Sequence, residues 1–161
     1  MGERSLSSHI NRRNQPAMVN VGAKAVTRRT ARVRAIVSLP RAVLSHLERG
    51  EIQSTKGPVF QTAILAGIMA AKRTAELIPL CHPIGIEDCR VDIRLNPKKE
   101  AVIECCVEAH HKTGVEMEAL TGAAVAALTL YDMCKGWSHD IVIKEIRLLE
   151  KEGGKSDFQA R

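Results

Sequence analysis

One long segment without charge constrains the fold of this chain more than any other feature. Residues 113–135 read TGVEMEALTGAAVAALTLYDMCK, and positions 119–130 contain no charged residue. Such a segment is expected to form a helix that is buried on most of its sides. Glu116 and Glu118 stand at its start, and Asp132 and Lys135 stand at its end. Because an unpaired buried charge is costly, these four groups require partners or a function.

Composition narrows the class of protein. A chain of 161 residues with 45% hydrophobic content can form one domain with a real core. Aromatic residues make up only 2% of the chain, which argues against a platform that stacks the bases of single-stranded nucleic acid. The net charge is +6, and basic residues are concentrated in the first quarter. They predict a solvated basic surface or, alternatively, a surface that binds a polyanion such as RNA or a phosphorylated small molecule.

Cysteine and hydropathy patterns indicate the compartment. The five cysteines form an odd set without a disulfide framework, which is typical of reduced thiols in the cytoplasm. No apolar run approaches the length of a membrane span, and the start of the chain lacks the apolar stretch of a secretory signal. The sequence has no CxxC or HxxxH pattern, so no metal site is predicted.

The order of predicted elements indicates an α+β fold. Strands are expected over residues 31–39, 89–95, 101–109 and 141–149, and helices over 40–47, 59–78 and 113–135, with a linker at 52–57. This order, βααββαβ, predicts a ferredoxin-like two-layer sandwich, with an antiparallel sheet and helices packed on one face. We expect a flexible basic arm over residues 1–17, a single α+β catalytic domain over 18–155 and a tail over 156–161.

The two ends of the long helix allow competing interpretations. Thr113 and Glu116 match a capping box, which explains Glu116 but not Glu118. Asp132 and Lys135 share a helical face, as either a local ion pair or an acid–base pair, and spacing alone favours the ion pair. Glu118 and Asp132 are about 21 Å apart along an unbroken helix. Either the helix breaks near Gly122, or its two ends serve different sites.

Two further places in the chain are candidates for binding. Pro83 restrains the backbone of His82, which either bonds to local backbone or points reproducibly into a site. The pairs Lys56-Gly57 and Gly154-Lys155 are suited to phosphate contact, although neither belongs to a Walker loop.

Together these segments resemble one family. AGIMAAKRTAELIPLCHPI, KTGVEMEALTGAAVAALTLYDMCK and IRLLEKEGGKS are similar to segments of molybdenum cofactor biosynthesis protein C (MoaC), and the resemblance extends over residues 18–155. It implies a cytoplasmic lyase that converts 3′,8-cyclo-7,8-dihydro-GTP to cyclic pyranopterin monophosphate and releases pyrophosphate. It also implies a ferredoxin-like homohexamer, a trimer of dimers with its sites at subunit interfaces, and no nucleic acid or membrane partner. The resemblance implies that no cofactor is required, although Mg²⁺ can bind together with the triphosphate.

The resemblance also implies roles for individual residues. Asp132, Lys135 and Lys56 match the catalytic group. The positions that match substrate-binding segments, or that would contact the triphosphate, are Leu80, Cys81, His82, Glu116, Met117, Glu118, Arg29, Lys151 and Lys155.

The chain departs from the family pattern at a few positions. Pro58 stands after Lys56-Gly57, where the family often has Asp, and is expected to alter the loop more than the chemistry. Asn20 and Gly22 replace residues that are commonly Asp and Ser, and GGKSDF, which includes Lys155, is one residue shorter than the usual GGKSGDF. The alternatives to a lyase are a non-catalytic nucleotide- or RNA-binding module, and a scaffold that would leave Asp132, Lys135 and His82 unexplained.

Overall fold

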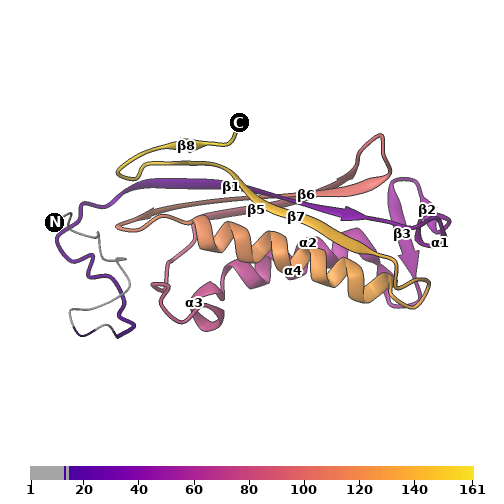
Figure 1. The fold of residues 1–161 in the computed structure, drawn as a ribbon, viewed down its shortest axis with the longest axis horizontal. Helices are drawn as coiled ribbons and strands as arrows, with labels where there is room; N and C mark the ends of the chain where they lie inside the picture. Colours follow the sequence, from indigo (N-terminus) through magenta and orange to yellow (C-terminus); the bar gives the residue numbers. More distant parts are fainter. Residues whose placement is uncertain (1–12, 14) are drawn as a thin grey trace.

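A computed structural model describes residue 13 and residues 15–161 of the chain. One five-stranded sheet is covered on one face by two long helices, and a smaller three-stranded sheet lies at one end (Figure 1). Most of the predicted arm, residues 1–17, lies outside the described residues. Within the described part, no helix combines the length and apolar character of a membrane span.

The large sheet has the predicted topology. Its central strand β1 (Thr27–Ser38) pairs antiparallel with β6 (Glu100–His111) and with β7 (Val142–Glu152). Strand β5 (Asp88–Leu95) forms one edge beside β6. The order β5-β6-β1-β7, with one long helix before β5 and another before β7, is the ferredoxin-like arrangement, so that prediction is confirmed.

The two long helices lie close together because small residues meet where they cross. Helix α2 (Val59–Ala71) packs against α4 (Glu116–Cys134). A Cβ atom on Gly67 would lie 2.8 Å from the carbonyl oxygen of Gly122, and one on Gly122 would lie 2.7 Å from the Cys105 Sγ on the sheet. The predicted burial of the uncharged helix is confirmed, since its inward face, from Ala119 to Leu130, is shielded from solvent.

The second predicted helix is shorter than expected. It was placed at 59–78, but α2 ends at Ala71 and a separate turn, α3 (Thr74–Leu77), follows. Arg73 departs from helical geometry, with φ −113° and ψ 16°, and the Thr74 hydroxyl donates to the Ala71 carbonyl. This side chain supplies a local partner for the backbone, which ends the helix at this point.

Two predictions for residues 40–57 were wrong. Residues 52–57 are not a linker, because β2 (Leu47–Glu48), β3 (Glu51–Ser54) and β4 (Gly57–Pro58) form the small sheet. The preceding helix, predicted at 40–47, is only α1 (Arg41–Leu44). Arg49 and Gly50 both have positive φ, 50° and 85°, which is the geometry of a tight hairpin rather than of a helix stop.

The C-terminal segment is also more ordered than predicted. Residues 156–161 were expected to form a tail, but β8 (Phe158–Gln159) pairs with β7. Asp157 accepts a hydrogen bond from the Gly153 amide at 3.1 Å, and Gly153 has φ 83°. The chain therefore reverses at Gly153 and adds a fifth strand to the sheet.

Candidate functional site

Helix α4 carries one group of ionisable residues at each end, as the sequence predicted. The helix runs unbroken from Glu116 to Cys134, so the alternative of a break near Gly122 is wrong. Glu118 and Asp132 are therefore about 21 Å apart at the standard helical rise. A small substrate cannot contact both side chains of one chain, so the two groups are described separately.

At the C-terminal end, one carboxylate joins two lysines. Lys135 Nζ lies 2.8 Å from Asp132 Oδ1, and Lys56 Nζ lies 3.1 Å from Asp132 Oδ2. Lys56 also reaches the backbone carbonyl of Asp132 at 3.4 Å. Lys135 first, and Lys56 second, hold the pKa of Asp132 below its ordinary value, and Asp132 raises the pKa of Lys135. The resting group is thus an ionised carboxylate between two ammonium groups, with one excess positive charge.

These three side chains come from two separate elements. Asp132 and Lys135 are three residues apart on α4, whereas Lys56 comes from the tight turn between β3 and β4. All three are about half exposed, between 49% and 56%, so the group can reach a ligand. The spacing on the helix indicated the first pair, but only the folded chain shows that Lys56 joins it.

At the N-terminal end of α4, a cavity of about 540 Å³ opens. All nine residues that match the binding segments line it: Arg29, Leu80, Cys81, His82, Glu116, Met117, Glu118, Lys151 and Lys155. Lys24 and Lys112 also line the cavity and were not predicted. Their positions in the sequence, in a loop and beside a strand end, gave no pattern that separates them from solvated lysines. Asp132, Lys135 and Lys56 lie outside this cavity.

Glu118 is the buried charge at the cavity wall. Its side chain belongs to a residue that is only 3% exposed, and its Oε2 atom has no hydrogen-bond partner among the described residues. Burial, and then the charge of Glu116, raise the pKa of Glu118. Burial also raises the pKa of the Cys81 thiol, with a further contribution from Glu118. An unpartnered buried carboxyl of this kind is suited to bind a hydrogen-bond donor of a ligand.

The predicted capping box is wrong. Helix α4 has Val115 as its N-cap, with φ −111° and ψ 21° and without a side-chain hydrogen bond. Thr113 instead contacts His111, with 3.0 Å between Oγ1 and Nδ1. Glu116 turns toward the cavity and forms an ion pair with Lys151, 3.1 Å between Oε1 and Nζ. The cavity therefore accounts for Glu116 better than the helix start does.

Several cavity residues are held by backbone carbonyls. His82 Nε2 donates to the carbonyl of Val19 at 2.8 Å. Val19 lies 63 residues away in the chain, so the partner is backbone but not the local backbone that one interpretation of His82 predicted. Arg29 donates to the carbonyls of His111 and Lys112 at 3.2 and 3.3 Å. These bonds fix the imidazole and the guanidinium at the rim of the cavity.

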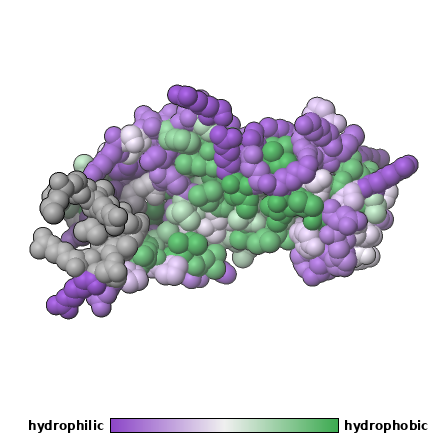
Figure 2. Space-filling model, in the orientation of Figure 1, coloured by the Kyte–Doolittle hydropathy of each residue, from purple (hydrophilic) through white to green (hydrophobic). Residues whose placement is uncertain are grey.

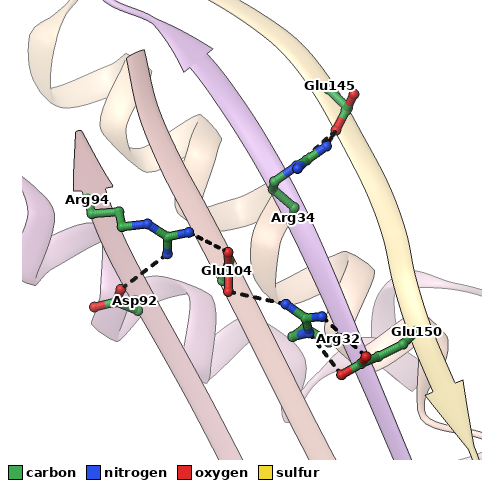
Figure 3. Close-up of polar contacts among 7 residues, drawn as sticks. All are labelled: Arg32, Arg34, Asp92, Arg94, Glu104, Glu145 and Glu150. Carbon is green, nitrogen blue, oxygen red and sulfur yellow. Dashed lines mark hydrogen bonds and ion pairs between the residues drawn. The ribbon is translucent and has the colours of Figure 1, made fainter. Parts of the chain in front are cut away.

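The open face of the sheet bears on the polyanion alternative. Arg28, Arg32 and Arg34 of β1 form ion pairs there with Glu108, Glu150 and Glu145, at 2.6, 2.9 and 2.7 Å. Figure 3 shows the middle of this array, in which Glu104 also joins Arg32 to Arg94. Each of these arginines is matched by a carboxylate, so the face is a neutralised ladder and not a bare cationic groove.

The described residues contain no group of three or more His, Cys, Asp or Glu side chains that could hold a metal ion. They do place lysines and arginines around the cavity, at Lys24, Arg29, Lys112, Lys151 and Lys155. The candidate site is therefore suited to bind a small polyanion through ammonium and guanidinium groups.

Comparison with known proteins matches almost the whole chain to one family. The MoaC family matches residues 18–154. A "Cyclic pyranopterin monophosphate synthase" of Xanthomonas oryzae is 48% identical over 153 residues, which cover 95% of this chain and 93% of that protein. A "Molybdenum cofactor biosynthesis bifunctional protein" of Synechocystis is 49% identical, and "Molybdenum cofactor biosynthesis protein 1" of Dictyostelium discoideum is 47% identical. The matches cover 93% and 92% of this chain but only 44% and 26% of those two longer proteins.

Proposed function

This chain belongs to the MoaC family, and on that premise we propose that it is a cyclic pyranopterin monophosphate synthase. It is a lyase of molybdenum cofactor biosynthesis that converts 3′,8-cyclo-7,8-dihydro-GTP to cyclic pyranopterin monophosphate and releases pyrophosphate. The observation that carries this proposal is the joint placement of the motif residues. Nine of them surround one cavity, and the other three form one cluster of two lysines and a carboxylate.

The cavity supplies binding. The triphosphate of the substrate lies against the lysines and Arg29 at the rim, and each cation compensates part of its charge. Glu118 accepts a hydrogen bond from the polar edge of the ring system, which satisfies its unpartnered Oε2 atom. Mg²⁺ can share the triphosphate with these cations, but no protein ligand set is required for it.

The cluster of Lys56, Asp132 and Lys135 supplies proton transfer and charge stabilisation. Opening the purine ring and closing the pterin ring move several protons, and a positioned ammonium group can donate one in the transition state. Asp132 then holds the neutral lysine and the charged lysine in place. When the cyclic phosphate closes, a substrate hydroxyl attacks the α-phosphorus, its proton passes to the neutral lysine, and the bond to pyrophosphate breaks. The remaining cations offset the negative charge that develops on the leaving group.

A complete site requires two chains. Because the cavity and the cluster lie at opposite ends of one straight helix, one small substrate meets both only if they come from different subunits. The exposed faces of α2 and α4 carry Leu65, Met69 and Leu128, which are 59%, 45% and 58% exposed. Figure 2 shows hydrophobic side chains gathered over the helices, a surface suited to a second copy. We infer a cytoplasmic homohexamer, a trimer of dimers with its sites at subunit interfaces; the five free thiols suit a reducing compartment.

The first test is an assay with the cyclised GTP intermediate. The wild type is expected to form the pterin product and pyrophosphate, and Asp132→Ala and Lys135→Ala are expected to lose at least a hundredfold in kcat, within the usual range for removing a proton-transfer group. Undiminished turnover in both variants, or no product from the wild type, would contradict the proposal.

The second test is complementation between two inactive variants. Asp132→Ala keeps an intact cavity and Glu118→Ala keeps an intact cluster, so refolding the two together places both intact halves at some interfaces. Activity is expected to return in the mixture and in neither variant alone. The control is a mixture of two double variants, Asp132→Ala/Glu118→Ala and Lys135→Ala/Glu118→Ala. Neither chain has an intact cavity, so this mixture should stay inactive. If the first mixture is also inactive although mixed oligomers form, the two halves of a site come from one chain.

A further inference from the structure

We propose that Glu51 is a positioning residue for Lys56, by acting as the N-cap of helix α2 from a neighbouring strand. This inference rests on the proposed catalytic role of Lys56. It concerns a residue outside the cavity and outside the cluster, and it explains how this chain places a proline after Lys56-Gly57.

The Glu51 carboxylate is organised by backbone amides. Its Oε1 atom accepts hydrogen bonds from the amides of Ile52 and Phe60, both at 2.8 Å, and its Oε2 atom accepts one from the amide of Gln61 at 3.1 Å. Phe60 and Gln61 are the second and third residues of α2. Their amides have no partner within the helix, since the first turn of a helix leaves its N–H groups free.

Pro58 explains why this help from outside the helix is needed. Pro58 occupies the N-cap position of α2 and makes no side-chain hydrogen bond there. An Asp at an N-cap accepts from the amides of the second and third helical residues, which are the two that Glu51 serves. Pro58 also has the extended backbone of an N-cap, with φ −69° and ψ 124°. Glu51 thus does from β3 what an aspartate would do at position 58.

The same hydrogen bonds fix the turn that carries Lys56. Glu51 begins β3, Lys56 lies in the turn after it, and α2 begins two residues past Gly57. Inside the turn, the Lys56 amide donates to Ser54 Oγ at 3.1 Å, and Ser54 Oγ donates to the Gly57 carbonyl at 2.9 Å. Gly57 has φ 114°, a conformation that other residues rarely adopt. Glu51 therefore clamps both ends of this short segment to each other.

The clamp is directed at the cluster. Lys56 Nζ lies 3.1 Å from Asp132 Oδ2. Asp132 belongs to α4, which is distant from this turn in the sequence. The negative charge of Glu51 also contributes, after burial, to raising the pKa of Cys134 to about 11. Helix α2, whose first turn Glu51 holds, packs against both β3 and α4, so loss of the Glu51 carboxylate would displace Lys56 relative to Asp132 and Lys135.

The experiment compares Glu51→Ala with the double variant Glu51→Ala/Pro58→Asp. In the single variant, kcat is expected to fall by about tenfold to a hundredfold, the range that follows from a displacement of about 1 Å in a catalytic group. KM should change less than twofold, because no cavity residue is altered. The double variant should recover most of the lost kcat, since an aspartate at the N-cap binds the same amides. If Glu51→Ala does not fold, the same measurements are made on Glu51→Gln, which keeps the shape of the side chain.

Controls separate positioning from general stability and from the proposed function. Glu100→Ala removes another turn-organising carboxylate, which contacts Lys144 and Asn96, and should leave kcat unchanged. If Lys56→Ala is impaired while Glu51→Ala keeps the kcat of the wild type, the positioning role is wrong and the proposed function stands. Recovery of the melting temperature without kcat in the double variant would also overturn it. If the wild type makes no product, amide hydrogen exchange at Lys56 and Gly57 tests the positioning role directly. Protection of these amides that is the same in Glu51→Ala as in the wild type would overturn that role.

Discussion

The substitution Glu118→Gln is expected to stabilise the protein at neutral pH and to impair its activity. Glu118 is 3% exposed, and one of its carboxylate oxygens has no hydrogen-bond partner among the described residues. Glutamine has nearly the same shape but no charge, so the substitution removes the desolvation cost without leaving a cavity. A buried unsatisfied polar group costs about 1–3 kcal/mol, and a charged one costs more. The glutamine amide also lacks a partner there, so only the excess cost of the charge is removed. We therefore expect a gain in the free energy of unfolding at pH 8 of about 1.4 kcal/mol for each unit by which burial raises the pKa of Glu118.

The gain should depend on pH in a defined direction. Burial raises the pKa of Glu118 above its ordinary value of 4.5, so over some interval the folded protein keeps a proton that the unfolded chain has released. In the wild type this contribution is fully present below the unfolded-state pKa and is lost as pH rises through the folded-state pKa. The loss is at most about 1.4 kcal/mol per pH unit for one proton. Glu118→Gln does not titrate, so its advantage should vanish below the unfolded-state pKa, grow between the two pKa values and stay constant above the folded-state pKa.

Thermal unfolding of the protein between pH 4 and pH 8 measures this difference. At this chain length, each kcal/mol corresponds to about 2–4 °C in melting temperature. Glu116→Gln is the matched control, because Glu116 is paired with Lys151 and its neutralisation should give no gain. The Cys81 thiol offers a second readout, since loss of the Glu118 charge should lower its pKa and speed its alkylation. A Glu118→Gln variant that is less stable than the wild type at pH 8, or a difference that does not vary with pH, would refute the reasoning.

Three other predictions concern helix α4. Asp132→Asn should abolish turnover and lower the pKa of Lys135 while leaving thermal unfolding nearly unchanged, because the cluster is half exposed; kinetics and calorimetry check it. Gly122→Ala should destabilise the protein by about 1–3 kcal/mol, because its Cβ would press on Cys105, whereas Gly136→Ala has open space and should be neutral in urea unfolding. The Cys134 thiol, buried and with a pKa of about 11, should resist alkylation at pH 8 until the chain unfolds, which mass spectrometry can follow.

Sequence patterns predicted the large sheet well because its strands and helices have strong, regular periodicity. The charged residues of β5 alternate with Val91, Ile93 and Leu95, and the uncharged core of α4 allows only a buried helix. The small sheet was missed because strands of two to four residues contain too few positions to establish a period. Its turn at Arg49 and Gly50 looks the same in sequence as the end of a helix.

In the candidate site too, contacts between residues close in the sequence could be predicted, whereas contacts between distant segments could not. The pair of Asp132 and Lys135 follows from helical spacing, and the cavity residues follow from motifs that the family shares. The partner of Glu116 could not be predicted, because Lys151 lies on β7 and meets the start of α4 only after the sheet has formed. Thr113 and Glu116 have the sequence spacing of a capping box, but Glu116 pairs with Lys151 instead of capping the helix. Lys24 and Lys112 were missed for the same reason.

The close packing of α4 explains why its functional groups are divided between two ends. At Gly122 the helix lies so near to both α2 and the sheet that a single added Cβ would meet Cys105 at 2.7 Å. An ionisable side chain on the inward face of this middle stretch would be buried without a partner, which is costly. The charged groups of α4 stand outside this stretch, Glu116 and Glu118 at one end and Asp132 and Lys135 at the other. Under the proposed function, the segment that makes the core stable separates binding from proton transfer within each chain, and we propose that a second subunit brings the two together.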